Sequence, residues 1–228
     1  MQELSRVFHL LGQVFLAALI IISGASGRAA AQPQPRNAFT PEMRRHIDWL
    51  ARQTLAEQHL AGFSLAIAQD GKLIYTQAYG YRNIAQHLPA TPQTIYNIAS
   101  ITKQFTATSI MLLQEDGKLN IDDPLSKYLA NYPWADQVTV RELLNHTSGI
   151  PDYLDIVDNF TLTIPKIESA LGKTHLEFPP GSKYEYSNSN YVLLGLIMQR
   201  VSGLPYDDFL RRRIFEPLHL TATSVGTS

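Results

Sequence analysis

The clearest pattern of apolar and polar positions lies in FSLAIAQDGKLIYTQAYGY, residues 63–81. Two runs rich in β-branched and aromatic residues flank Asp70-Gly71, and an Asp-Gly turn between such runs is typical of a β-hairpin. Before the hairpin, Thr40-Pro41-Glu42 places a capping residue in front of a proline at the first helical position. The pattern therefore predicts a helix from there to about His59, followed by a two-stranded sheet.

The next predicted helix runs from about Ser100 to Glu115 and has apolar residues on nearly every side. These residues are Ile101, Phe105, Ala107, Ile110, Met111, Leu112 and Leu113. A helix with this distribution is normally buried. No convincing strand follows the hairpin. Shorter helices are predicted at about 138–146, 167–172, 189–201 and 206–215.

The N-terminus has the pattern of a secretory signal peptide. Arg6 precedes an apolar run that is unbroken over 14–22, and small residues follow, ending in Ala29-Ala30-Ala31. This order of charge, apolar run and small-residue site predicts a signal peptide over residues 1–31. We therefore expect residues 32–228 to form the mature chain, in the periplasm or secreted. An uncleaved membrane anchor is the alternative, although the unbroken run is short for a membrane span.

Composition excludes several classes of function. The chain has no cysteine, which removes disulfides and thiolate chemistry, and its seven histidines form no close pair that would suggest a metal site. A net charge of −1 without a strong basic cluster indicates neither nucleic acid nor an anionic membrane surface as a partner. Phosphate-binding glycine motifs are absent too, so we expect no metal and no cofactor.

Ser100 and Lys103 form the first candidate site. Lys103 is the only charged residue between Ser100 and Gln114. In a buried helix we expect burial to lower the pKa of this amine, and one helical turn brings the lysine and the serine onto the same face. The pair then predicts Ser100 as a nucleophile with Lys103 as its base, and the Ser100 amide as an oxyanion donor. The alternative is a chance spacing with an ordinary surface lysine.

Tyr186-Ser187-Asn188 forms the second candidate, directly before a predicted helix. Its structural alternative is a helix start, with Asn188 or Ser189 as the cap and Tyr186 as a half-buried aromatic. A Tyr-x-Asn triplet also occurs at residues 81–83, in the second strand of the predicted hairpin, where we expect it to contribute to packing of the sheet. The HTSG segment suggests a His146–Ser148 pair, but the glycine and proline that follow favour the end of a helix.

Four segments in order resemble the serine beta-lactamase and penicillin-binding protein family, in its branch of class C beta-lactamases, D-Ala-D-Ala carboxypeptidases and related esterases. The segments are NIASITKQFTA at 97–107, LLNHTSGIPDY at 143–153, FPPGSKYEYSNSNYVLLG at 178–195 and FEPLHLTATS at 215–224. The resemblance implies an α/β fold of the α+β kind, with helices around a central antiparallel sheet.

The resemblance also implies roles for the candidate residues. Ser100 would form an acyl-enzyme, Lys103 and Tyr186 would share the proton transfers, and Asn188 would bind the substrate amide or hold Lys103 in place. The substrate would be a small molecule or a peptide: a β-lactam, a D-Ala-D-Ala peptide or a small ester. The sequence does not decide among these three substrates, because the choice depends on pocket residues, some of which belong to the part that is absent.

Family members carry a third motif, Lys-Thr-Gly or His-x-Gly, on a later strand, and nothing of that kind follows Asn188. We therefore expect the C-terminal strands of the sheet to be missing and the hairpin edge to be bare. A truncated gene product, a fragment of a longer chain, or a reduced domain whose sheet a second chain completes would each explain this. The functional alternative to hydrolysis is a non-catalytic remnant that binds a partner chain or cell-wall peptide without turnover.

Overall fold

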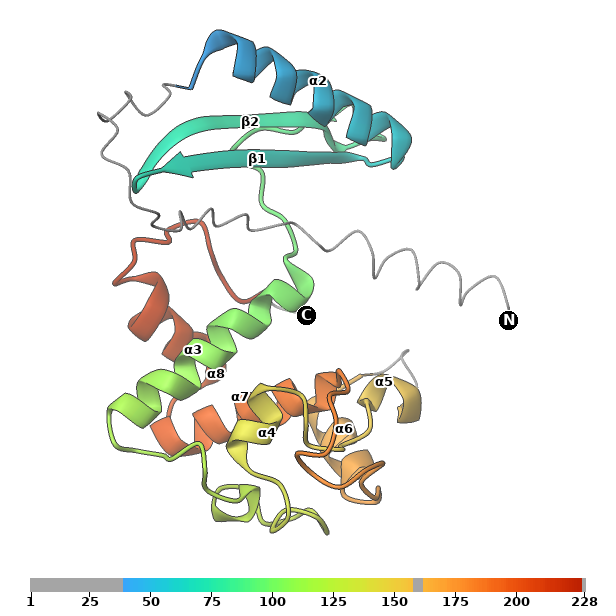
Figure 1. Cartoon of the computed structure of the whole chain (residues 1–228), viewed down its shortest axis with the longest axis vertical. Coiled ribbons are helices and arrows are strands. Elements are labelled where there is room, and N and C mark those ends of the chain that lie inside the picture. Colours follow the sequence, from blue (N-terminus) through green and yellow to red (C-terminus); the bar gives the residue numbers. More distant parts are fainter. Residues whose placement is uncertain (1–38, 158–161, 227–228) are drawn as a thin grey trace, which may run out of the picture. The chain divides into compact units, whose positions relative to one another are not determined.

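The computed structural model describes residues 39–157 and 162–226 (Figure 1). The signal peptide or membrane anchor predicted for residues 1–31 lies outside these ranges. Within them, no helix is long and apolar enough to cross a membrane. The chain divides into two compact units, residues 1–94 and residues 95–228, and each is described by itself.

The first unit begins with helix α2 (Pro41–Glu57), whose start is as predicted. The Thr40 hydroxyl accepts a hydrogen bond from the Met43 amide, and Pro41 occupies the first turn. Strands β1 (Gly62–Gln69) and β2 (Lys72–Asn83) then pair antiparallel, which confirms the hairpin. Asp70 and Gly71 both have positive φ, 50° and 73°, as a tight turn matched to the twist of the strands requires. A short strand β3 (Leu88–Pro89), which was not predicted, pairs with the end of β2.

Helix α2 is attached to the sheet by a partly buried polar contact. The hydroxyls of Tyr75 and Tyr79 donate to Asp48 Oδ1 at 2.6 Å and 2.5 Å. The two tyrosines are four residues apart on β2, so both point to the face along which α2 lies (Figure 1). These hydrogen bonds lower the pKa of Asp48, that of Tyr75 being the larger cause, and the carboxylate therefore stays ionised against the tyrosine pair.

The second unit is helical in the ranges described. All four short helices predicted after residue 115 are present, and α5 and the 3₁₀ turns are additional. The elements are η1 (Ala99–Ile101, 3₁₀), α3 (Thr102–Glu115), η2 (Leu125–Lys127, 3₁₀), α4 (Val140–Leu144), α5 (Tyr153–Ile156), α6 (Ile164–Leu171), α7 (Asn188–Ser202), α8 (Tyr206–Leu210) and the π-helical turn η4 (Arg211–Phe215).

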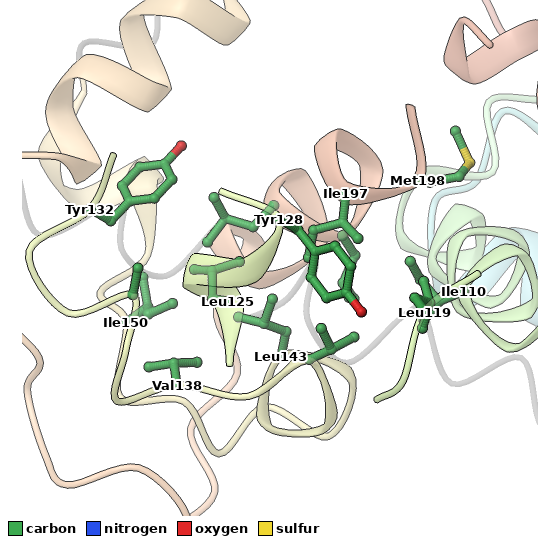
Figure 2. Packing of buried hydrophobic residues seen from close by; sticks show 14 of the residues in the cluster. Ile110, Leu119, Leu125, Tyr128, Tyr132, Val138, Leu143, Ile150, Ile197 and Met198 are labelled. Atoms are coloured by element: carbon green, nitrogen blue, oxygen red, sulfur yellow. The ribbon is translucent and has the colours of Figure 1, made fainter. Parts of the chain in front are cut away.

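The core of this unit lies where α3, α4 and α7 meet. Ile110 of α3, Leu143 of α4 and Ile197 of α7 are fully buried and belong to one apolar cluster (Figure 2). Full burial of one such side chain stabilises the fold by about 1.5–3 kcal/mol. Leu125 and Val138, from the segment between α3 and α4, complete the same cluster. This packing fixes the start of α7 relative to the start of α3, where the candidate residues lie.

The expectation that α3 is buried on nearly every side is wrong. Its buried positions are Thr106, Ser109, Ile110 and Leu113. Met111 is 45% exposed. The exposed positions Gln104, Thr108, Met111 and Glu115 recur every three or four residues, so they form one stripe along the helix. The helix therefore carries an apolar residue on a face that is not part of the core, and periodicity alone did not reveal this.

Candidate active site

Ser100 lies in η1, and Lys103 lies in the first turn of α3. The Lys103 Nζ atom is 3.2 Å from the Ser100 Oγ atom. Ala99, just before the serine, has a φ of 43°, and its amide donates to Asn97 Oδ1 at 2.8 Å. A residue with a Cβ in this left-handed region costs about 1–3 kcal/mol and is found preferentially at functional sites. The tight turn brings Ser100 to the start of the helical segment, where amides lack intrahelical partners.

Tyr186 and Asn188 reach the same place from the other end of the unit. The Tyr186 hydroxyl is 2.9 Å from Ser100 Oγ, although the two residues are 86 positions apart in sequence. Asn188, the first residue of α7, accepts a hydrogen bond from Lys103 Nζ at 2.8 Å through its Oδ1 atom. The structure therefore brings together all four residues that were singled out in the sequence.

Asp152 supports this group, and sequence analysis did not identify it. Its Oδ2 atom accepts from both the backbone amide and the side-chain amide of Asn188, at 3.0 Å and 2.8 Å. Its Oδ1 atom accepts from the Leu154 amide and caps α5. Because Asn188 Nδ2 donates to Asp152, Asn188 Oδ1 must face Lys103. This arrangement favours the role of Asn188 in holding Lys103.

The expected cap of α7 is corrected by the same contact. The N-cap residue is Ser187, not Asn188 or Ser189, and its side chain makes no capping hydrogen bond. The Asp152 carboxylate instead accepts the Asn188 amide, and a negative charge there is favourable beside the helix dipole. An acidic residue near the end of the segment LLNHTSGIPDY was the only sequence signal for it.

His146 lies behind Tyr186. The two rings are stacked, with centroids 4.6 Å apart, and the histidine is 8% exposed. His146 Nδ1 accepts from the Ser187 amide at 3.2 Å and lies 3.2 Å from Asn190 Nδ2, which assigns the ring proton to Nε2. Burial lowers the pKa of His146, and the charge of Lys103 lowers it further. A neutral imidazole therefore supports the ring of Tyr186.

The HTSG segment is not a nucleophile and base pair. Ser148 Oγ donates to Asn190 Oδ1 at 2.6 Å, and Asn190 Nδ2 contacts His146. Gly149 has a φ of 76°, and a Cβ atom there would be 2.2 Å from the Phe178 carbonyl oxygen. The segment is thus a tight loop after α4, as its glycine and proline suggested, and it places both His146 and Asp152.

The amine of Lys103 contacts uncharged groups. In the described part of the chain its hydrogen-bond acceptors are Ser100 Oγ and Asn188 Oδ1. The rings of Tyr186 and Tyr191 lie 4.9 Å and 5.5 Å from Nζ. The Ser100 hydroxyl is therefore within reach of two groups that exchange protons, an amine and a phenol.

A cavity of about 570 Å³ opens beside Ser100. Lys103, Thr106 and Asn188 line it on one side, and later residues of α7 line it on another. Among the residues described, no cluster of three or more His, Asp or Glu side chains could hold a metal ion. Chemically, the arrangement suits nucleophilic attack by the Ser100 hydroxyl.

These groups place a serine hydroxyl within hydrogen-bond distance of an amine and a phenol, a combination typical of the class of serine hydrolases that work by acyl transfer. The family described as Beta-lactamase matches residues 47–228 of the sequence. The chain therefore belongs to the beta-lactamase family. The expected fold, with helices and an antiparallel sheet of the beta-lactamase and transpeptidase kind, is confirmed.

Individual relatives agree with this assignment. Protein flp of Staphylococcus aureus (strain N315) is 34% identical over 194 residues, which cover 82% of this chain and 39% of that protein. Penicillin-binding protein 4* of Bacillus subtilis (strain 168) is 34% identical over 189 residues, covering 80% and 42%. D-amino acid amidase from Ochrobactrum anthropi SV3, solved with L-phenylalanine amide, gives a TM-score of 0.70 at 34% identity, covering 78% of this chain and 52% of that chain. The chain spans about two fifths of the length of the two curated relatives.

Proposed function

We propose that this chain is a serine hydrolase that forms an acyl-enzyme at Ser100. The observation that carries the proposal is the position of one oxygen atom. Ser100 Oγ is 2.9 Å from the Tyr186 hydroxyl and accepts a hydrogen bond from the Lys103 amine at 3.2 Å, so two groups that can exchange a proton with it lie within hydrogen-bond distance.

The reaction has two halves. In the first, Ser100 Oγ bonds to the carbonyl carbon, its proton passes to Lys103 or Tyr186, and the Ser100 amide donates to the carbonyl oxygen as charge develops there. The bond from that carbon to the leaving group then breaks, and the leaving group takes a proton. We assign this proton to Tyr186, which is 43% exposed and contacts Ser100 Oγ directly. In the second half, water attacks the ester carbon and returns Ser100 to its free form.

We propose a β-lactam, a D-Ala-D-Ala peptide, or a small ester or amide as the substrate. Support comes from the names of two relatives, a penicillin-binding protein and a D-amino acid amidase. Both names describe molecules with an amide or strained amide carbonyl, which is the group that an activated serine attacks. We also propose a periplasmic or secreted location, which N-terminal sequencing of the mature protein tests by a start at Gln32.

Intact-mass measurement with a penicillin tests the acyl-enzyme. We expect a mass increase equal to that of the penicillin in the wild-type chain and none in Ser100→Ala, both folded by near-ultraviolet circular dichroism. Lys103→Ala should form the adduct at least about 10²-fold more slowly, since the proton acceptor is lost. A folded wild-type chain without any adduct, tested also with an activated ester, contradicts the proposal. That result would support a remnant that binds without turnover.

A further inference from the structure

The cavity beside Ser100 extends well beyond the four residues already described. Residues on one face of α7 form its long wall, with the half-buried Val192 and Leu196 and the buried Gly195. These positions are three or four residues apart, so they follow Asn188 along the same side of the helix. The volume of about 570 Å³ is that of a site for a small organic group.

The cavity carries little charge. Among the residues that the structure describes, Lys103 is the only charged side chain on its wall, and its amine already donates to Ser100 and Asn188. Several polar groups on the wall are bonded within the protein. Thr106 and Tyr206 share a hydrogen bond of 2.6 Å, and Gln199 Oε1 accepts from the Tyr206 amide. A charge placed against the apolar face of α7 would lose hydration that these side chains do not replace.

Under the proposed mechanism, the position of Tyr186 assigns the cavity to the acyl side of the reacting carbonyl. Tyr186 contacts Ser100 Oγ but is not part of the cavity wall. If Tyr186 gives the leaving group its proton, the leaving group must lie towards Tyr186. The acyl group then extends the other way, past Ser100 and Lys103 into the cavity. From these observations we propose that the site prefers acyl donors with a neutral, bulky apolar acyl group, an inference that rests on the proposed hydrolase function.

Hydrolysis of a series of esters by the full chain tests the preference for neutral, apolar acyl groups. For p-nitrophenyl acetate, butyrate and hexanoate, we expect kcat/KM to rise about three- to fourfold per added methylene, since each is buried. The 4-methylpentanoate ester should exceed the isosteric monoanionic succinate ester by about 10²-fold or more, because the succinate carboxylate finds no partner. Lengthening the alcohol of an acetate ester should have little effect. A flat acyl series, a preferred succinate, or sensitivity to the alcohol alone overturns the inference.

Variants of the wall connect the preference to the cavity. Leu196→Ala removes apolar wall, and Val192→Phe fills the space, so each should lower the ratio of hexanoate to acetate kcat/KM by about fivefold or more. Leu218→Ala is the matched control, because Leu218 is 63% exposed and lies outside the cavity. Its ratio should equal that of the wild type. An unchanged ratio in both wall variants contradicts the inference.

Binding without turnover separates this inference from the proposed function. Hydrolysis of p-nitrophenyl acetate that Ser100→Ala does not reduce would overturn the function, whatever the acyl preference. The cavity is then tested by calorimetry on Ser100→Ala with hexanamide, acetamide and the anionic succinamate. Hexanamide should bind at least about tenfold more tightly than either of the other two. Equal binding of all three overturns the inference even where catalysis is intact.

Discussion

Asp152 determines the geometry of a site whose reacting atoms it does not touch. One of its oxygens holds both nitrogen atoms of Asn188, and the other caps α5. The carboxylate thus links the starts of two helices and leaves only the Asn188 Oδ1 atom facing Lys103. A carboxylate is well suited to this position because it only accepts hydrogen bonds, so the orientation of the Asn188 amide is unambiguous.

The first prediction concerns Asp152→Asn. The new amide both donates and accepts, so Asn188 can turn over and present Nδ2 to Lys103, which repels the amine. We expect the rate of acylation to fall by about 10²-fold, as for other small displacements of catalytic groups, with little change in KM. Stopped-flow acylation with an activated ester measures this.

Asp155→Asn is the matched control, because Asp155 lies three residues on, in α5, and is exposed. Its acylation rate should equal that of the wild type. A wild-type rate in Asp152→Asn as well would show that the orientation of Asn188 does not depend on the carboxylate.

The second prediction concerns the pH dependence of stability. The pKa of His146 is lowered below its ordinary value of 6.5 by burial and by Lys103. Below that pH the unfolded chain therefore binds a proton that the folded chain does not. The free energy of unfolding should be greatest above this range and fall on acidification, by at most about 1.4 kcal/mol per pH unit for this group. Urea unfolding between about pH 7.5 and about pH 5.5 measures the slope.

His146→Asn is the informative variant. Asparagine tolerates the φ of 60° at this position and keeps an acceptor for the Ser187 amide, but it does not titrate. Its stability should fall less on acidification than that of the wild type. Equal slopes in the two proteins would show that His146 does not carry the effect.

Ser100, Lys103, Tyr186 and Asn188 could be found in the sequence because each pair has a short, recognisable spacing. The roles of Asp152 and His146 could not be found in this way, because their contacts with the segment 187–188 cross 36 and 41 positions of sequence. The side chain of a histidine within HTSG has the same local context whether it supports a tyrosine or faces solvent. Only the packing of α7 against the loop after α4 determines whether the histidine is buried against the tyrosine or faces solvent.

At the scale of elements, the loop of residues 146–152 is the piece that links α4 to the site. The Glu185 amide donates to the His146 carbonyl, and the Gly181 amide donates to the Thr147 carbonyl. The loop therefore pairs with the segment that leads to Tyr186. Its closest approach is at Gly149, where the Phe178 carbonyl leaves no room for a side chain.

The third prediction compares two glycines with similar backbone conformation. Gly149 and Gly117 have φ values of 76° and 69°, but only Gly149 has an atom within reach of an added Cβ. Gly117→Ala should cost only the left-handed penalty, about 1–2 kcal/mol of unfolding free energy. Gly149→Ala adds an overlap with backbone and should cost about 3 kcal/mol or more. Urea unfolding of both variants measures the difference, and equal losses would contradict the described approach of Phe178.

Local chemistry made several elements predictable. The Asp-Gly turn and the Thr-Pro start have side chains that favour those conformations by themselves, and the structure contains both. Helix α5 has only four residues and is capped by Asp152, which also serves α7. A helix of this length has too few residues for a periodic pattern of apolar and polar positions to be recognised. The exposed stripe of α3 was missed because apolar residues occur on nearly all sides of this helix. Their distribution therefore does not show which face packs against the core.

At the scale of the molecule, all four candidate residues and the cavity belong to residues 95–228. The apolar cluster of that unit is built from its own residues. The family and its fold could be assigned from four ordered segments between residues 97 and 224, whereas the division into two units depends on contacts between residues that are far apart in sequence. How much of the site is independent of the first unit is therefore a question for experiment.

The fourth prediction is that residues 95–228 fold when expressed alone. The buried cluster should give a single cooperative urea transition by circular dichroism, with a native near-ultraviolet signal from its tryptophan and tyrosines. Residues 39–94 are the natural comparison, because two long strands and one helix bury less apolar surface and should unfold at lower denaturant. A broad, non-cooperative transition of residues 95–228 would show that this unit needs the first.

The separation of 86 positions between Ser100 and Tyr186 has a consequence for experiments on refolding. The hydroxyls of these two residues meet only after the core between α3 and α7 has formed, so no early intermediate with local helices alone can react. Covalent labelling of the serine would then report arrival at the native state. Pulses of an acylating reagent during refolding would time the last steps of assembly, independently of any spectroscopic signal.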